Sequence, residues 1–270
     1  MIPVQPFLQK DAYNYKEQRE KQLGIAQFYE FTVQADAQVF RAVPDGSTDL
    51  VFGINETDTR IYIGGTVLQA KGWEFEEGRT YFGARFLPGR CILPKDLQIK
   101  EIVNTDLELD PYAYGSSLIG QMAEQKTMAD RSRLLVEHFA HWERVQEKET
   151  ISAIERYCRS RIYATQGLIS VKELAAETGY TEVYIRRIFQ RIHGISPKVF
   201  EQFVRFQNLL QAVQKDTTER RFDEIAYDCG YYDQSHMIKD FKRFAGTTPE
   251  QYQECMKETK NKNSGRQKGE

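Results

Sequence analysis

The chain has 270 residues and a mass of 31.5 kDa, with 40% hydrophobic and 28% charged residues. These values are typical of a folded chain of one large or two ordinary domains, and they exclude an intrinsically disordered protein. No run of residues approaches the ~18 apolar positions of a transmembrane helix, and residues 1–10 lack the pattern of a signal peptide. We therefore expect a cytoplasmic protein whose four scattered cysteines are reduced.

The formal net charge of −2 conceals an uneven distribution. Residues 1–150 contain 17 Lys and Arg against 23 Asp and Glu, whereas residues 151–270 contain 20 against 16. A basic segment beside an acidic one is typical of a nucleic-acid-binding domain joined to a second domain, although two ordinary solvated surfaces would give the same numbers. Charge alone leaves both interpretations open.

The first part of the chain predicts a β-rich domain within an α+β fold. Segments 25–33, 49–54, 60–65 and 80–86 are short, rich in aromatic or β-branched residues, and bounded by Gly and Pro turn signals. Such strands favour an antiparallel barrel, of cupin-like type among others, or a sandwich. Apolar residues then recur at helical spacing over 115–147, which predicts two helices that either pack against the β-domain or form a dimer interface.

From residue 150 the pattern is helical and contains an internal repeat. Two copies are too few for a repeat array, so we interpret residues 170–200 and 222–252 as a duplicated module. Six pairs of identical residues match at offsets of 51 or 52 residues: Ala175/Ala226, Gly179/Gly230, Tyr180/Tyr231, Phe189/Phe241, Gly194/Gly246 and Pro197/Pro249.

Each copy has the pattern of a helix, a glycine turn and a second helix. In the first copy, Ser170 and Glu173 predict a capping box, Gly179 ends the first helix and Thr181 caps the second. The second copy has three residues in the corresponding roles: Asp223, Gly230 and Asp233.

The second helix of each copy combines an apolar stripe with a basic outer face. A helix-turn-helix places such a helix in the major groove, where Arg, Lys, Gln and Ser pair with base edges. The alternative is an ordinary helical hairpin with a solvated basic face, and two copies in the basic half favour the DNA-binding interpretation. Residues 197–214 predict a linker helix of 18 residues, a rod of roughly 27 Å, which would hold the two helices about one DNA turn apart.

These motifs resemble the AraC/XylS family of bacterial transcriptional regulators. The second copy contains I-A-x-x-x-G-Y at 225–231, D-x-S-H at 233–236 and G-x-T-P-x-x-Y at 246–252, and residues 170–200 resemble the first motif of the same domain. The resemblance implies a non-enzymatic, sequence-specific transcription activator that binds double-stranded DNA through residues 150–256. With the outward-facing Gln190 and Lys242 added, the expected DNA contacts are Val183, Arg186, Arg187, Gln190, Gln234, Ser235, Ile238, Lys239 and Lys242.

Two positions depart from the family pattern. Met237 stands where the family usually has Phe, and Lys239 where it usually has Arg. Because lysine lacks the planar fork with which arginine grips guanine, a phosphate contact is the expected role of Lys239. Val183 and Ile238 offer only apolar contact, for example to a thymine methyl group.

Residues 1–147 resemble an N-terminal domain that precedes such DNA-binding domains, through P-D-G-x-x-D-L-V at 44–51 and G-x-R-F-x-P-G at 83–89. The resemblance implies a small-molecule effector or homodimerisation, and RNA polymerase as partner of an activator. The tail 257–270 is polar and expected to be disordered. Five residues are candidates to line an effector pocket, although for each one taken singly the commoner role is an aromatic in the core or an arginine paired with a carboxylate: Tyr62, Trp73, Tyr81, Phe82 and Arg85.

Other functions receive less support. His138 and His141 are spaced for a metal pair, but no third ligand accompanies them, so neither a metal nor any other cofactor is expected. A cupin-like enzyme would need a cluster of His and carboxylates in the first 115 residues, yet the first histidine is His138. A protein-interaction adaptor remains an alternative, in which the basic faces of 182–190 and 234–242 would be dispensable.

Overall fold

The computed structural model describes residues 4–7, 13–33, 40–145, 153–215 and 220–266. Within them the strands form two antiparallel sheets, a larger one of order β1-β2-β7-β4-β5-β8 and a smaller one that pairs β3 with β6. The bounds are β1 Tyr13–Arg19, β2 Ile25–Thr32, β3 Phe40–Ala42, β4 Thr48–Ile54, β5 Thr59–Gly64, β6 Lys71–Trp73, β7 Thr80–Phe86 and β8 Asp106–Glu108, and a short 3-10 helix η1 covers Ile99–Glu101.

The four strands expected from the sequence are confirmed as β2, β4, β5 and β7, which lie next to one another in the larger sheet. Strands β2, β4 and β7 are found because both of their faces are largely buried, which requires apolar and aromatic residues along their length. Strand β5 is found from its alternation, in which Ile61 and Ile63 are buried and Arg60 and Tyr62 are partly exposed. The remaining strands lie outside the sequence prediction. β1 has the polar sequence YNYKEQR at the sheet edge, and β3, β6 and β8 are three residues each.

An aromatic core joins the two sheets as a sandwich. Phe40 of β3 and Trp73 of β6 pack with Tyr29, Phe31 and Tyr81 of the larger sheet. The Phe31 and Tyr81 rings stack with centroids 5.6 Å apart. The smaller sheet therefore covers one face of the larger one.

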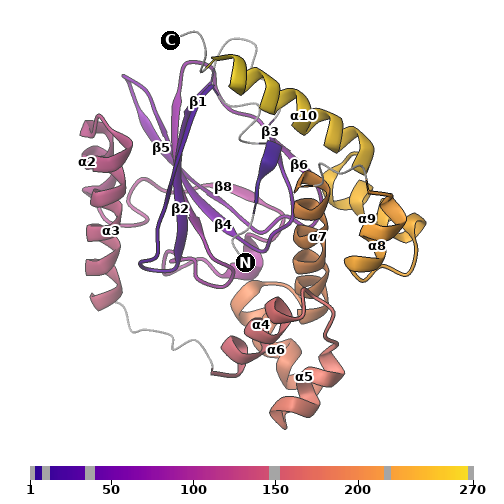
Figure 1. Cartoon of the computed structure of the whole chain (residues 1–270). Coiled ribbons are helices and arrows are strands. Elements are labelled where there is room, and N and C mark those ends of the chain that lie inside the picture. The colour runs from indigo at the N-terminus through magenta and orange to yellow at the C-terminus, as the bar shows by residue number, and fades with distance from the viewer. Residues whose placement is uncertain (1–3, 8–12, 34–39, 146–152, 216–219, 267–270) are drawn as a thin grey trace.

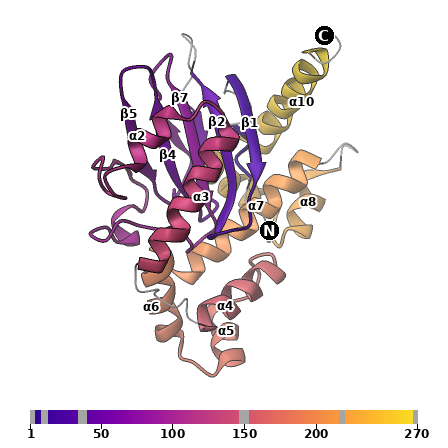
Figure 2. The same ribbon diagram turned by 90° about the vertical axis from the view of Figure 1, so that its left-hand side faces the viewer.

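Helices α2 (Leu118–Glu124) and α3 (Met128–Val145) cover the opposite face of the larger sheet (Figures 1 and 2). Leu118 and Phe139 are buried in one cluster with Phe82. A buried hydrogen bond of 2.5 Å from Arg131 to Glu30 of β2 ties α3 to the sheet. Of the two alternatives for this region, packing against the β-domain is confirmed.

The remaining helices lie on the other side of the sheet, around the long helix α7 (Figure 1). Their bounds are α4 Ala153–Ala164, α5 Val171–Thr178, α6 Glu182–His193, α7 Pro197–Lys215, α8 Phe222–Asp228, α9 Gln234–Ala245 and α10 Pro249–Arg266. The two helix-turn-helix units, α5–α6 and α8–α9, and the linker helix α7 are where the sequence predicts them.

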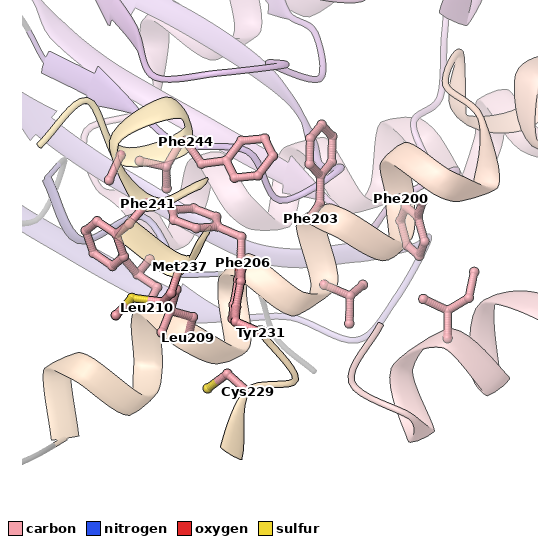
Figure 3. Packing of buried hydrophobic residues seen from close by; sticks show 14 of the residues in the cluster. Phe200, Phe203, Phe206, Leu209, Leu210, Cys229, Tyr231, Met237, Phe241 and Phe244 are labelled. Carbon is pink, nitrogen blue, oxygen red and sulfur yellow. The ribbon is translucent and has the colours of Figure 1, made fainter. Parts of the chain in front are cut away.

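Helix α7 forms the centre of the helical core. Phe203 and Phe206 of α7 face Phe241 and Phe244 of α9 (Figure 3). The Phe206 and Phe244 rings have centroids 5.1 Å apart. Complete burial of these rings fixes α9 against α7.

Two features differ from the sequence prediction or go beyond it. Helix α10 continues to Arg266, so residues 257–266 are helical rather than disordered, and 267–270 lie outside the described residues. The buried Tyr252 and Met256 anchor the start of α10, and Lys257, Glu258, Lys260 and Lys262 are good helix formers in its continuation.

The segment 4–7 lies between the β-domain and the helical part, because Gln5 contacts Val43 and Phe7 belongs to the helical core.

No helix within the described ranges is both long and apolar enough to cross a membrane.

Candidate nucleic-acid interface

The first helix-turn-helix has the caps that its sequence predicts. The Ser170 hydroxyl accepts from the Glu173 backbone N–H at 3.2 Å, and the Ser170 N–H donates to the Glu173 carboxylate at 2.8 Å. Gly179 ends α5 with φ 73°, a left-handed conformation that glycine adopts without strain. Thr181 caps α6 by accepting from the Tyr184 N–H at 3.2 Å. These bonds fix where the recognition helix α6 begins.

The second unit repeats this arrangement with one difference. Gly230 has φ 72°, and Asp233 caps α9 by accepting from the His236 N–H at 2.7 Å. The expectation that Asp223 caps α8 is wrong, because the N-cap is Arg221 and no side chain caps it. Asp223 lies in the first turn of α8, where a negative charge still interacts favourably with the helix dipole.

Both recognition helices bury one stripe and expose the other. In α6, Ile185, Ile188 and Phe189 are buried, and in α9, Met237 and Phe241 are buried. The exposed residues include eight of the nine expected DNA contacts: Val183, Arg186, Arg187, Gln190, Gln234, Ser235, Lys239 and Lys242. The ninth, Ile238, is partly buried and packs against the helical core.

Not all the expected contacts on α6 are equally available. Arg186 donates to Glu182 at 2.7 Å, and the Gln190 amide donates to the Gly194 carbonyl at 2.7 Å, where it helps to close the end of the helix. Within the described residues, Arg187 forms no ion pair, and its side chain is exposed. Of the two arginines among the expected contacts on α6, Arg187 is therefore the one outside an ion pair with its own helix.

A buried polar network holds the end of α6. The Glu155 carboxylate of α4 bonds to His193 Nε2 at 2.9 Å and accepts from Arg159 Nε at 2.7 Å. Burial alone would raise the pKa of Glu155, but the His193 hydrogen bond and the nearby charges outweigh it, so the pKa lies below its ordinary value. Glu155 therefore stays ionised and pins the last turn of the recognition helix to α4.

The second recognition helix is held from α7. Arg205 donates to Asp240 of α9 at 3.4 Å, and its guanidinium lies 4.7 Å from the centroid of the Tyr231 ring in the preceding turn. Asp240 and Tyr231 are both buried. Arg205 thus ties α9 and its turn to the linker helix.

Two groups of exposed aromatics beside the recognition helices lie outside the sequence prediction. Tyr180 and Tyr184 stack with centroids 4.9 Å apart at the start of α6. Tyr232, directly before the cap of α9, is 94% exposed, and Tyr227 is 81% exposed. The sequence does contain a signal for Tyr232. The two copies of the repeat match at an offset of 51 residues up to Tyr231 and of 52 residues from Asp233, so Tyr232 is the one residue of the second turn without a counterpart in the first.

Of the five candidate effector-contacting residues, the structure brings two together. Trp73 and Arg85 line one pocket, with Tyr29, Phe40, Arg41 and Phe75. Phe82 lies in the core on the opposite face of the sheet, and the Tyr81 hydroxyl accepts from the Glu76 N–H at 2.9 Å. Tyr62 is half-buried at the edge of the aromatic core.

Arg85 is buried and paired with carboxylates, which is the alternative to a ligand contact that the sequence also allowed. Its Nε and Nη2 donate to the two oxygens of Asp49 at 3.0 and 2.9 Å. Its Nη1 lies 3.6 Å from Asp45, beyond hydrogen-bond distance, and has no acceptor among the described residues; the same holds for the buried Trp73 Nε1. Two residues that line the pocket thus each have one buried donor without an acceptor among the described residues.

His138 and the four cysteines lie in surroundings that favour neither metal binding nor thiol reactivity. His138 Nε2 contacts the Tyr114 carbonyl at 2.8 Å. The four cysteines are free thiols, and burial raises the pKa of Cys91 above its ordinary value, which lowers its reactivity. In the part of the chain that the structure describes, no three His, Cys, Asp or Glu residues cluster as metal ligands.

Comparisons with known proteins agree with the geometry of the helical part. A family model described as "Helix-turn-helix domain" matches residues 174–254. Regulatory protein SoxS of Salmonella typhimurium is 31% identical over 85 residues, which is 31% of this chain and 77% of SoxS, and SoxS of Escherichia coli K12 matches to the same extent.

Solved structures include similar chains. A probable AraC family transcriptional regulator from Rhodopseudomonas palustris has 27% identity and a TM-score of 0.35, covering 40% of this chain and 98% of its own. ToxT from Vibrio cholerae has 10% identity and a TM-score of 0.44, covering 90% of this chain and 98% of its own. On the family model and the SoxS match, this chain belongs to the AraC/XylS family of helix-turn-helix transcriptional regulators, which bind DNA.

Proposed function

We propose that the chain regulates transcription by placing α6 and α9 in two successive major grooves of one DNA duplex. The observation that carries the proposal is the presence of two capped recognition helices, each with an exposed polar and basic face, packed against one long helix, α7. Helix α7 has 19 residues, about 28 Å at the usual rise, which suits two grooves one turn of DNA apart.

The side chains suggest distinct roles along the two helices. Arg187 has the geometry to bind guanine O6 and N7, and Gln234 to bind adenine N6 and N7. Val183, 62% exposed, suits a thymine methyl group. Lys239 and Lys242 lie on the exposed side of α9, and we assign them to phosphates. Arg186 must leave Glu182 before it contacts DNA, and Ile238 is too buried for a major role.

The two-groove proposal can be tested with the full chain on binding sites selected from random duplex DNA. Hydroxyl-radical footprinting then maps the protein on a selected site. We expect two protected segments one helical turn apart, on one face of the duplex. A single protected segment, or binding without sequence preference, would refute the proposal. Transcription in vitro from the selected site should show activation.

We also propose that the β-domain binds a small-molecule effector in the pocket lined by Trp73, Arg85 and Phe75. The support is the pair of buried donors, Arg85 Nη1 and Trp73 Nε1, that lack acceptors among the described residues. An unpaired buried donor costs free energy that a ligand oxygen would recover. Aromatic walls favour a ligand with a flat or apolar body.

Thermal unfolding of the full chain in the presence of a compound library tests the effector proposal. A ligand of this pocket should raise Tm in the wild type, raise it less in Trp73→Phe, and change the affinity for the selected DNA site. Arg133→Ala, on the exposed surface of α3, is the matched control and should respond as the wild type does. Stabilisation that is unaffected by Trp73→Phe would place the ligand elsewhere.

A further inference from the structure

Equivalent positions of the two helix-turn-helix units touch the β-domain. Gly194 and Gly246, 52 residues apart, end α6 and α9 with φ 69° each. A Cβ added at Gly194 would lie 2.5 Å from Val103 Cγ2, and one at Gly246 would lie 3.2 Å from the Ala70 Cβ. The turn glycine Gly179, by contrast, has nothing within 4 Å among the described residues. The β-domain therefore contacts the C-terminal ends of both recognition helices, whereas their DNA-contacting faces stay exposed.

The contact with α9 is polar and directional. Arg41, in β3, donates through Nη1 to the backbone carbonyl of Ala245, the last residue of α9, at 3.3 Å. A cation at this end of a helix interacts favourably with the unpaired carbonyls and the helix dipole. The Phe7 ring lies 5.2 Å from the Arg41 guanidinium and packs edge-on against Tyr252 of α10, so the arginine is held from both sides.

The contact with α6 is close packing. Val103 follows η1 and meets Gly194, and the turn at Gly89 meets the preceding residue, since a Cβ added at Gly89 would lie 2.6 Å from His193 Cε1. His193 is the residue that Glu155 holds from α4. Two segments of the β-domain thus fix the last turn of α6, and no side chain larger than hydrogen fits at either glycine without a shift.

Between these two contacts the β-domain also follows α7. The Gln207 amide of α7 donates to the Pro44 carbonyl at 3.0 Å, and a Cβ added at Gly46 would lie 3.0 Å from the Phe200 ring. The β-domain therefore spans the whole distance from the end of α6 to the end of α9. A second rigid connection parallel to α7 restricts both the angle and the distance between the two recognition helices.

We infer that Arg41 and Val103 are positioning residues through which the β-domain holds the two recognition helices at one spacing. The inference rests on the proposed reading of two successive grooves. Each base pair inserted between two half-sites moves the second by about 3.4 Å and turns it by about 35° around the duplex, as one turn holds 10–10.5 base pairs. A pair of helices held by both α7 and the β-domain should discriminate more strongly against such an insertion than a pair held by α7 alone.

The test uses the full chain and three duplexes that carry the selected site, the site with one base pair inserted between its half-sites, and one half-site only. The wild type should prefer the selected spacing over the insertion by tenfold or more. Arg41→Gln, which removes the charge and shortens the side chain, should reduce this preference to about threefold or less while binding the single half-site as the wild type does. Val103→Ala should act in the same direction, and Arg41→Lys should restore the preference.

Arg133→Gln on α3 removes an exposed arginine far from both helices and should behave as the wild type. If Arg41→Gln and Val103→Ala keep the tenfold preference, or lose affinity equally for all three duplexes, the positioning role is overturned. If the wild type itself does not discriminate the insertion, the two-groove proposal fails first. The wild-type measurement therefore separates the two failures.

Discussion

Glu155 and His193 form a buried hydrogen bond of 2.9 Å that joins the first helix of the DNA-binding part to the last residue of its first recognition helix. Both side chains are 1% exposed, and Arg159 completes the network from the partly exposed side of α4. A buried carboxylate with two donors is stable only while both donors remain in place. The end of α6 is therefore held by one ionised group.

Glu155→Gln should lower the free energy of unfolding by ~1–3 kcal/mol, because the neutral amide loses the charge that strengthens the bonds of Oε1 to His193 and Arg159, and its NH2 group replaces a buried Oε2 that has no partner among the described residues. Urea denaturation of the full chain at pH 7 measures the change. Glu177→Gln is the matched control, as it breaks an exposed pair with Arg161 and should change stability little. Equal losses in the two variants would contradict the special role of the buried network.

The same pair predicts a dependence on pH. The folded pKa of Glu155 lies below its ordinary value of 4.5, so its stabilising contribution is present above about pH 4.5 and is lost as the pH falls through the folded pKa. The stability difference between wild type and Glu155→Gln should therefore be constant near neutrality and shrink below pH 4.5. Denaturation series across this range give the difference directly. A stability difference that increased below pH 4.5 would contradict the lowered pKa of Glu155.

Arg187→Ala should weaken binding to the selected DNA site by ~1–3 kcal/mol, a loss of roughly 5- to 150-fold in affinity. Arg187 is exposed and outside the ion pairs of α6, so the free protein should remain as stable as the wild type. Binding isotherms together with thermal unfolding test both parts. Unchanged affinity would remove Arg187 from the interface.

Alanine substitutions of Lys239 and Gln234 should change DNA affinity in different ways, although both residues lie on the exposed side of α9. Lys239→Ala should lower affinity for specific and non-specific DNA alike and reduce the salt slope by about 1, as expected for one phosphate contact. Gln234→Ala should lower affinity for the selected site with little effect on non-specific DNA. A salt titration of each variant on both kinds of DNA distinguishes these patterns, and their reversal would exchange the two assignments.

Substituting alanine for two glycines of the β-domain should change the free energy of unfolding in opposite directions. At Gly83 in β7 the new Cβ would lie 2.1 Å from the Tyr29 ring, so Gly83→Ala should destabilise the chain by ~1–3 kcal/mol or more. Gly120 in α2 has nothing within 4 Å among the described residues, so Gly120→Ala should stabilise it by ~0.5–1 kcal/mol. Urea denaturation compares them, and a loss at Gly120 would mean that α2 is packed differently.

The helical part could be predicted closely because its signals are local. Capping by Ser170, Thr181 and Asp233 and the turns at Gly179 and Gly230 depend on a few neighbouring residues, and the structure confirms each of them. Asp223 is the exception, because an acidic residue in the first helical turn has the same composition signal as a cap.

The β-domain could be predicted only where a strand carries several buried apolar residues, continuously as in β4 or at alternate positions as in β5. Strand β3 depends on its pairing with β6, in which Phe40 lies opposite Trp73 across 33 residues of sequence, and three residues carry too short a pattern to be recognised alone. The pocket that Trp73 and Arg85 line combines residues from different sheets, and such a combination follows from topology rather than from spacing along the chain.

The segment 4–7 has a consequence for the order in which the molecule folds. The Val4 N–H donates to Gln207 at 2.9 Å across 203 residues of sequence, and the Phe7 and Tyr252 rings meet across a still longer separation. Contacts this distant in sequence are slow to form, because the ends of a long chain must meet before any contact energy is gained. The sheet and the helical bundle should therefore each condense first, and the docking of segment 4–7 should appear as a separate, later phase in refolding kinetics.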